Sequence, residues 1–102
     1  MMKEYIHQGD IIKIDKVKMP VLVVSKDFFN ETGEIIACPV YLNCETSALH
    51  IAVTTDDFRG IVHCEKLALL DLNVRGYVKT GNLGMSDIFN ITDAIQGIFD
   101  YI

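Results

Sequence analysis

His63 and Glu65 are two side chains whose types and spacing could do acid–base chemistry. They lie in the segment IVHCEKL, residues 61–67, where apolar and polar residues alternate as in a β-strand. On a strand, residues i and i+2 project from the same face, roughly 6–7 Å apart. An imidazole titrates near neutrality, so the pair could serve as acid and base. The alternative interpretation is that both residues are solvated on the outer face of an amphipathic strand.

Short β-rich segments must position this pair. They are DIIKID (10–15), PVLVVS (20–25), IIACPVY (35–41), ALHIAVT (48–54), IVHCEKL (61–67) and YVKTG (77–81). Turn-forming residues separate them, as in FFNETGE, residues 28–34, where Gly33 can adopt a positive φ. Pro39 lies inside the third segment and predicts an edge strand or a bulge there. The spacing of the segments predicts a mainly β, barrel-like fold over a single domain, residues 1–102.

The C-terminal segment changes to a helical period. Its apolar stripe recurs every three or four residues and comprises Ile88, Ile91, Ile95, Ile98 and Ile102. Phe89 and Phe99 are predicted to widen the stripe. Ser86 is a candidate N-cap, with Asp87 in the first turn, where the helix dipole favours a carboxylate. The segment therefore predicts an amphipathic helix that caps the barrel.

The three cysteines do not suggest a disulfide framework or a zinc site, because their number is odd and their spacing forms no ligand pairs. Cys38 and Cys64 lie in apolar segments and are predicted to be buried, reduced thiols. Cys44 lies in the polar segment LNCET and is predicted to be exposed. None of the three is predicted to be a nucleophile or a metal ligand.

Charge and hydropathy restrict the classes of function. The formal net charge of −5 disfavours nonspecific binding of nucleic acid, although a local groove can still be positive. The sequence has no apolar run near the roughly 20 residues of a membrane helix, and the N-terminus lacks the apolar region of a signal peptide. A soluble, cytoplasmic protein is expected. At 102 residues the core is modest, so a homodimer would bury further surface.

The order of these segments resembles the MazF/PemK family of toxin–antitoxin endoribonucleases, which includes the Kid toxin. The segment MPVLVVSKDFFN (19–30) is similar to the family's RPVLVIS…FN, and TGEIIACPVY (32–41) is similar to TGLVIVCPIT. GDII (9–12), GIVHCEKLALLDL (60–72) and RGYVKTGNLGMSDIFNITDAIQGIF (75–99) resemble the family's opening strand, its GVVRCDQ segment and its final turn and helix. The resemblance implies an SH3-like barrel of antiparallel strands, related to that of CcdB, with a C-terminal amphipathic helix.

The resemblance also implies an activity: cleavage of single-stranded mRNA without a metal or other cofactor, restrained by an antitoxin. His63 and Glu65 align with the Arg and Asp that act in catalysis in Kid-like members. Met19 and Tyr41, however, stand where the family usually has an Arg and a Thr or Ser that contribute to the site. The loop that ordinarily helps cover the site is shortened here to DKVKMP, residues 15–20. A methionine offers neither the charge nor the donors of an arginine.

Other residues are candidates for binding the substrate. Arg59, Arg75 and Lys79 could contact phosphates, and Phe28, Phe29 and Tyr41 could frame a groove for stacked bases. The simpler interpretation is that the three cations are solvated charges near turns, and that Tyr41 packs in the core or at a dimer interface.

Two other functions remain open at this stage. A catalytically degenerate member could act as a protein- or peptide-binding module, which the loss of the Arg and the shortened loop favour. A CcdB-like action on a topoisomerase is permitted by the fold, although a fold alone does not define a function.

Overall fold

The computed structural model describes residues 5–56 and 58–100. The elements in chain order are β1 (Asp10–Ile14), β2 (Val21–Val23), α1 (Asp27–Asn30), β3 (Glu34–Tyr41), β4 (His50–Thr55), β5 (Phe58–His63), β6 (Ala68–Asp71), β7 (Tyr77–Asn82) and α2 (Met85–Phe99). The strands form one seven-stranded sheet in the order β4-β5-β3-β2-β1-β7, and β6 pairs with β3 outside this path. Every strand pair is antiparallel.

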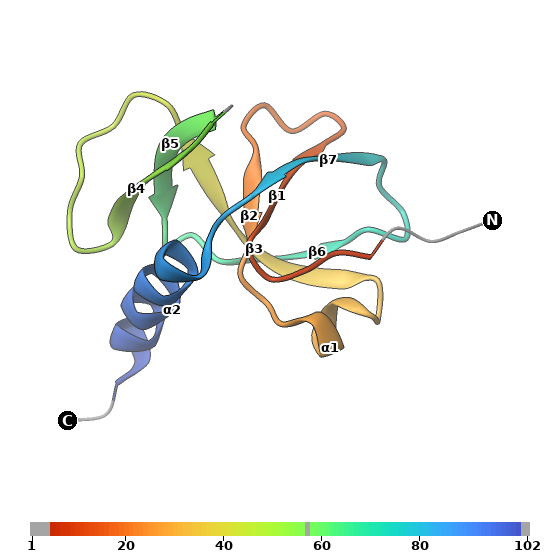
Figure 1. The fold of residues 1–102 in the computed structure, drawn as a ribbon. Coiled ribbons are helices and arrows are strands. Elements are labelled where there is room, and N and C mark those ends of the chain that lie inside the picture. The colour runs from red at the N-terminus through yellow and green to blue at the C-terminus, as the bar shows by residue number, and fades with distance from the viewer. Residues whose placement is uncertain (1–4, 57, 101–102) are drawn as a thin grey trace.

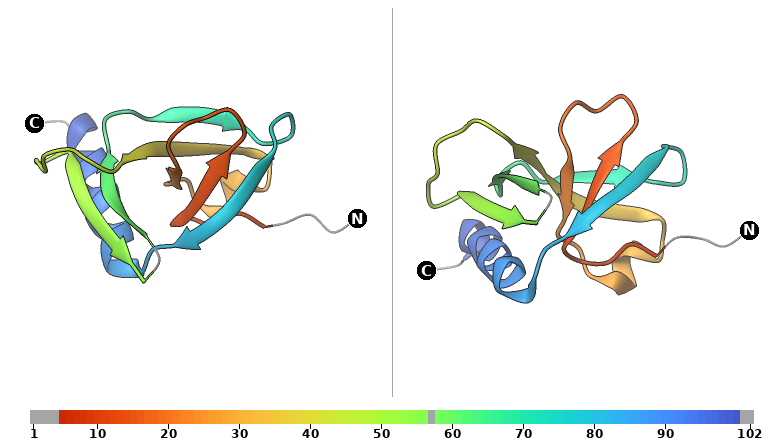
Figure 2. Two further views of the ribbon diagram at one scale, coloured as in Figure 1. Left: turned by 90° about the horizontal axis from the view of Figure 1, so that it is seen from above. Right: turned by 45° about the horizontal axis from the view of Figure 1, so that its top comes forward.

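The sheet curls into an open barrel, and α2 lies beside the part built from β4 and β5 (Figure 1). The view from above shows the curvature, with α1 and the N-terminal segment on the far side from β4 (Figure 2). This arrangement confirms the predicted mainly β fold of antiparallel strands with one C-terminal helix. No helix among the described residues is long and apolar enough to span a membrane.

The prediction for Pro39 is wrong, because β3 is a central strand. Residues Glu34 to Ala37 of β3 pair with β6, whereas Val40 and Tyr41 pair with β5. Pro39 lies between these two sets, and its opposite edge still pairs with β2. The missing N–H therefore falls where one partner strand has ended and the next has not begun. A central strand can accommodate a proline at such a position.

Both ends of β5 differ from the prediction, and the position of its C-terminal end matters for the candidate site. β5 begins at Phe58 and ends at His63, so Glu65 lies in the turn after the strand and not two residues along it. The segment predicted as a turn before β3 instead contains the short helix α1. The strand β6 was not predicted, because ALLD is a short apolar run without alternation.

Two clusters of buried apolar residues form the core, and one of them lies between the sheet and α2. This cluster includes Val62 of β5, Cys64 directly after β5, and Ile91 of α2. All three side chains are at most 1% exposed. Cys38 and Cys64 are buried free thiols and Cys44 is exposed, as predicted. Burial raises the pKa of Cys38 to about 12 and that of Cys64 to about 11, so neither is a thiolate at neutral pH.

The helix α2 buries a narrower stripe than the sequence predicts. Ile91 is fully buried and Ile88 and Ile95 pack beside it, but Phe89 is 59% exposed and Phe99 71% exposed. Ile102, which was assigned to the stripe, lies outside the described residues. The helix begins at Met85 with Gly84 as its N-cap, so the assignment of Ser86 as the cap is wrong. The acidic residue of the first turn is Asp87, as predicted.

Candidate functional site

A group of polar side chains lies on the outer face of β4 and β5. Alternation sends Ile51 and Val53 of β4 towards the core and His50 to the opposite face. The register of the two antiparallel strands sets His50 directly opposite His63, and paired residues project from the same face. The hairpin thus brings together two imidazoles that are thirteen positions apart in the sequence.

The two histidines form the centre of a four-residue cluster. Their rings stack with centroids 3.8 Å apart and planes 12° from parallel. Tyr41, from the end of β3, covers His63 from another side at a centroid distance of 4.3 Å and an interplanar angle of 50°. Glu65 returns from the turn after β5, and its Oε2 lies 2.8 Å from Nε2 of His50. We call His50, His63, Glu65 and Tyr41 the His50–His63 cluster.

His63 is only 7% exposed, and neither of its ring nitrogens has a hydrogen-bond partner in the described part of the chain. The burial is shallow, because the side chains that cover the ring, Tyr41 and His50, are themselves half-buried. Desolvation lowers the pKa of His63, and the neighbouring His50 adds to this effect. At neutral pH His63 is therefore a neutral imidazole, able to accept a proton without breaking a hydrogen bond to any described residue.

Glu65 and His50 form a carboxylate–imidazole pair at the exposed side of the cluster. Their side chains are 37% and 29% exposed, respectively. The hydrogen bond from His50 is the main cause that lowers the pKa of Glu65, so the carboxyl is ionised at neutral pH. The ionised carboxylate can accept the Nε2–H of the imidazole and so orients the His50 ring.

A shallow hollow adjoins the cluster and contains the two positions at which the sequence departs from the family pattern. Its wall includes Met19, Pro20 and Tyr41, with Lys18 at the rim. The Nζ of Lys66 lies 3.5 Å from the phenol oxygen of Tyr41 and 5.0 Å from its ring centroid. Lys66 beside Tyr41 and Lys18 in the lining of the hollow supply positive charge near Met19, the position where the resemblance has an arginine.

The structure brings together some of the predicted site residues and separates others. His63, Glu65 and Tyr41 meet in one cluster. Arg59 is exposed on the same face of β5, four residues before His63 and so roughly 13 Å along the strand. Arg75 and Lys79 belong to the turn before β7 and to β7 itself, at the other end of the strand order from β4.

Lys79 has a structural partner among the described residues. Its Nζ lies 3.1 Å from Oδ2 of Asp10, a carboxylate that is 1% exposed on β1. A buried carboxylate is stable only when it is paired or hydrogen-bonded, so Lys79 compensates Asp10. A contact between Lys79 and phosphate would have to compete with this ion pair.

His50 is the member of the His50–His63 cluster that sequence reasoning missed. A surface role without a partner is the expectation for it from the sequence, because no acidic or metal-binding residue stands near it in the chain. The available signal was the alternation of two segments joined by a short turn. Pairing them as a hairpin in the correct register would have placed His50 opposite His63.

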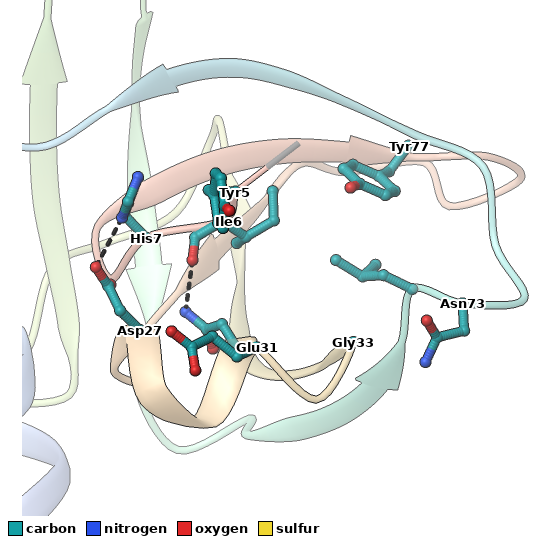
Figure 3. A pocket seen from close by; sticks show the side chains of 10 residues that line it. Tyr5, Ile6, His7, Asp27, Glu31, Gly33, Asn73 and Tyr77 are labelled. Atoms are coloured by element: carbon teal, nitrogen blue, oxygen red, sulfur yellow. Dashed lines mark hydrogen bonds and ion pairs between the residues drawn. The ribbon is translucent and has the colours of Figure 1, made fainter. Parts of the chain in front are cut away.

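A second cavity of about 260 Å³ lies on the side of α1 (Figure 3). Its lining includes His7, Asp27 and Tyr77, together with Asn30, whose Nδ2 donates to the carbonyl of Ile6 over 3.1 Å. His7 and Asp27 form another imidazole–carboxylate pair, with Nδ1 and Oδ2 2.7 Å apart. None of the predicted site residues lines this cavity, and its single histidine makes it a useful control for the His50–His63 cluster.

Residues 7–99 match the family of PemK-like, MazF-like toxins of type II toxin–antitoxin systems. The chain belongs to this family. No curated protein sequence matches it. The fold is also that of solved toxins, at 17–19% sequence identity.

Three solved structures illustrate the likeness. A MazE–MazF complex from Deinococcus radiodurans gives a TM-score of 0.86 at 17% identity, over 95% of this chain and 98% of the other. An endoribonuclease from a mycobacterial species gives 0.83 at 19% identity, over 97% and 95%. An endoribonuclease bound to its cognate antitoxin, also mycobacterial, gives 0.80 at 18% identity, over 91% and 93%.

Membership of the PemK-like, MazF-like family gives the His50–His63 cluster its context. The sequence resemblance aligns His63 and Glu65 with catalytic positions and Met19 and Tyr41 with positions that contribute to the site. The folded chain places Tyr41 against His63 and Met19 in the hollow beside them. Positions linked by resemblance alone are therefore neighbours in space.

Proposed function

We propose that this chain is the toxin of a toxin–antitoxin pair and a metal-independent endoribonuclease that cleaves single-stranded mRNA. The observation that carries the proposal is the His50–His63 cluster, which sets two imidazoles and a carboxylate side by side. Two of these residues, His63 and Glu65, are at positions that the resemblance aligns with catalytic ones. Since messenger RNA is the substrate, the site of action is the cytoplasm. Family membership and the solved endoribonuclease relatives support the same reaction class.

The residues have distinct roles in the proposed reaction. A base must remove the proton of the 2′-hydroxyl, which then attacks the adjacent phosphorus, and an acid must protonate the departing 5′-oxygen. His63, a neutral imidazole whose nitrogens have no partner among the described residues, suits the base, and His50, whose ring is oriented by Glu65, suits the acid. The lysines beside Tyr41 supply the positive charge that stabilises the phosphorane, in place of the missing arginine.

Protein partners are part of the proposal. Several solved relatives are complexes with an antitoxin, and we infer that an antitoxin neutralises this chain. An apolar groove beside α2, lined in part by Met85, Ile88 and Phe89, supports association with another protein chain. We also propose a homodimer, which the mass of the purified protein in solution would test.

The test is cleavage of a long, unstructured RNA by purified protein in EDTA. We expect 2′,3′-cyclic phosphate ends, and a rate loss of about 10²–10⁴ in each of His50→Ala and His63→Ala, because each removes a proton-transfer group. Glu65→Ala should lose less, since it orients His50. The matched control is His7→Ala, which breaks a similar imidazole–carboxylate pair on the other side of the barrel and should cleave at the unaltered rate.

The alternative function, a binding module without catalysis, predicts a different result. Folded protein would leave the RNA intact, and none of the three substitutions would change anything measurable in the assay. The methionine at position 19, which cannot stabilise charge in the hollow, is the feature that favours this alternative.

A further inference from the structure

The His50–His63 cluster contains a set of donor atoms that fits a metal ion. One donor atom from each of His50, His63 and Glu65 lies within 4.8 Å of the other two. They come from β4, from the end of β5 and from the turn that follows, so the strand register and the turn fix their approach. Two imidazole nitrogens and one carboxylate oxygen form a ligand set used for Zn²⁺ and other divalent transition metals.

An independent observation also points to a ligand at this site. His63 is more than nine-tenths buried, yet neither ring nitrogen has a hydrogen-bond partner among the described residues. A buried polar atom without a partner costs free energy, and binding an ion to its lone pair would compensate it. The His7–Asp27 pair has a comparable imidazole–carboxylate distance but only one histidine, which is exposed. The buried, unpartnered nitrogens of His63 therefore distinguish this site from an exposed imidazole–carboxylate pair.

We propose that His50, His63 and Glu65 form a binding site for one divalent transition-metal ion of the Zn²⁺ class. Mg²⁺ and Ca²⁺ are unsuited, because they prefer an all-oxygen shell. Three protein ligands leave at least one position for water, and the exposed side of Glu65 opens the site to solvent. The ion does not require a cysteine, and the buried thiols of Cys38 and Cys64 stay outside the site.

Binding requires a small rearrangement that the structure permits. A metal lies close to the plane of each imidazole that binds it, whereas the two rings stack only 12° from parallel. One ring must rotate, and His50 is the candidate because it is half-buried at the open side. In a tetrahedral site with bonds of about 2.1 Å, ligand atoms are roughly 3.4 Å apart. The 2.8 Å between His50 Nε2 and Glu65 Oε2 is a hydrogen-bond distance, so this bond must open and Nε2 must be free of its proton when both atoms bind the ion.

Metal binding has a consequence for activity, and this part rests on the proposed function. The ion would occupy the lone pairs that the reaction needs for proton transfer. Zn²⁺ therefore inhibits RNA cleavage, and EDTA restores it. The bound ion thus inhibits a reaction that itself uses no metal.

The experiment is a calorimetric titration of the full-length, tag-free protein with Zn²⁺, in a Cys44→Ser background that removes the exposed thiol. We expect one ion per chain. His50→Ala, at the open side, should weaken binding by about 100-fold or more, since even groups that only support metal ligands contribute about 10–100-fold. His63→Ala should do the same. His7→Ala should bind as tightly as the parent.

The outcomes separate the two proposals. Saturable binding that is lost in His50→Ala and kept in His7→Ala supports the site. No saturable binding, or binding that survives His50→Ala, overturns it, and this result does not depend on whether His63→Ala folds. If Zn²⁺ binds at the site but RNA is never cleaved in EDTA, the site stands and the endoribonuclease proposal fails. If RNA is cleaved in EDTA and Zn²⁺ neither binds nor inhibits, only the metal site fails.

Discussion

Replacing His63 with phenylalanine should stabilise the fold and abolish the activity. The His63 ring is covered by Tyr41 and His50, but its two nitrogens have no partners among the described residues. Phenylalanine keeps a planar ring that can stack on the same neighbours and carries no polar atom to desolvate. A buried residue that weakens the fold is expected where function, and not packing, determines its identity.

The magnitude follows from the two nitrogens. An unsatisfied buried polar group costs about 1–3 kcal/mol. The low end of that range applies for two reasons. Tyr41 and His50, which cover the His63 ring, are themselves only half-buried, and a phenyl ring is slightly larger than an imidazole. We expect His63→Phe to raise the free energy of unfolding by about 1–2 kcal/mol. For a domain of this size each kcal/mol shifts the Tm by about 4–8 °C.

The pH dependence has a definite sign. The pKa of His63 is lowered from its ordinary value of 6.5 in the folded chain, so below that pH the unfolded chain binds the proton more readily. The parent protein therefore loses stability as the pH falls from 6.5 towards the folded pKa of His63. Phenylalanine lacks this contribution, and the advantage of His63→Phe should grow over the same interval.

The assay is chemical denaturation in EDTA at pH values from about 7 down to 5, an interval around the ordinary histidine pKa. The matched control is His50→Phe, the same chemical change in the cross-strand partner. His50 has a partner in Glu65, so this substitution removes a hydrogen bond and should bring no gain. The reasoning is refuted if His63→Phe is less stable than the parent, if both variants shift alike, or if His63→Phe still cleaves RNA.

Two further predictions concern packing. In the native protein a chromogenic aryl disulfide should modify Cys44 alone, because Cys38 and Cys64 are buried and burial raises the pKa of both thiols. After denaturation it should modify all three thiols. Reaction of three thiols in the native protein would contradict the buried core. Gly9→Ala should destabilise by more than about 1 kcal/mol in denaturant melts, since a Cβ at φ +96° collides with a side chain of α2. Gly81→Ala has open space and no positive φ and is the control; an equal loss there would contradict the argument.

Some of the fold was readable in the sequence because it depends on local periodicity. Alternation in the segments around His50 and His63 predicted strands with one face inward, and isoleucines at helical spacing predicted α2. The apolar neighbours of Cys38 and Cys64 predicted buried thiols. Errors arose where the local pattern has more than one outcome, as at Pro39, whose strand is central because two partners share its edge in succession.

The sequence by itself determined the family, the order of six of the seven strands and of α2, and the two residues His63 and Glu65 as candidates for chemistry. Only the tertiary structure decided which other groups face them. Cross-strand register placed His50 against His63, and a turn returned Glu65 to His50 and not to His63. The physical reason is that a strand pattern specifies which face a side chain occupies, whereas its partner depends on pairing between segments that are distant along the chain.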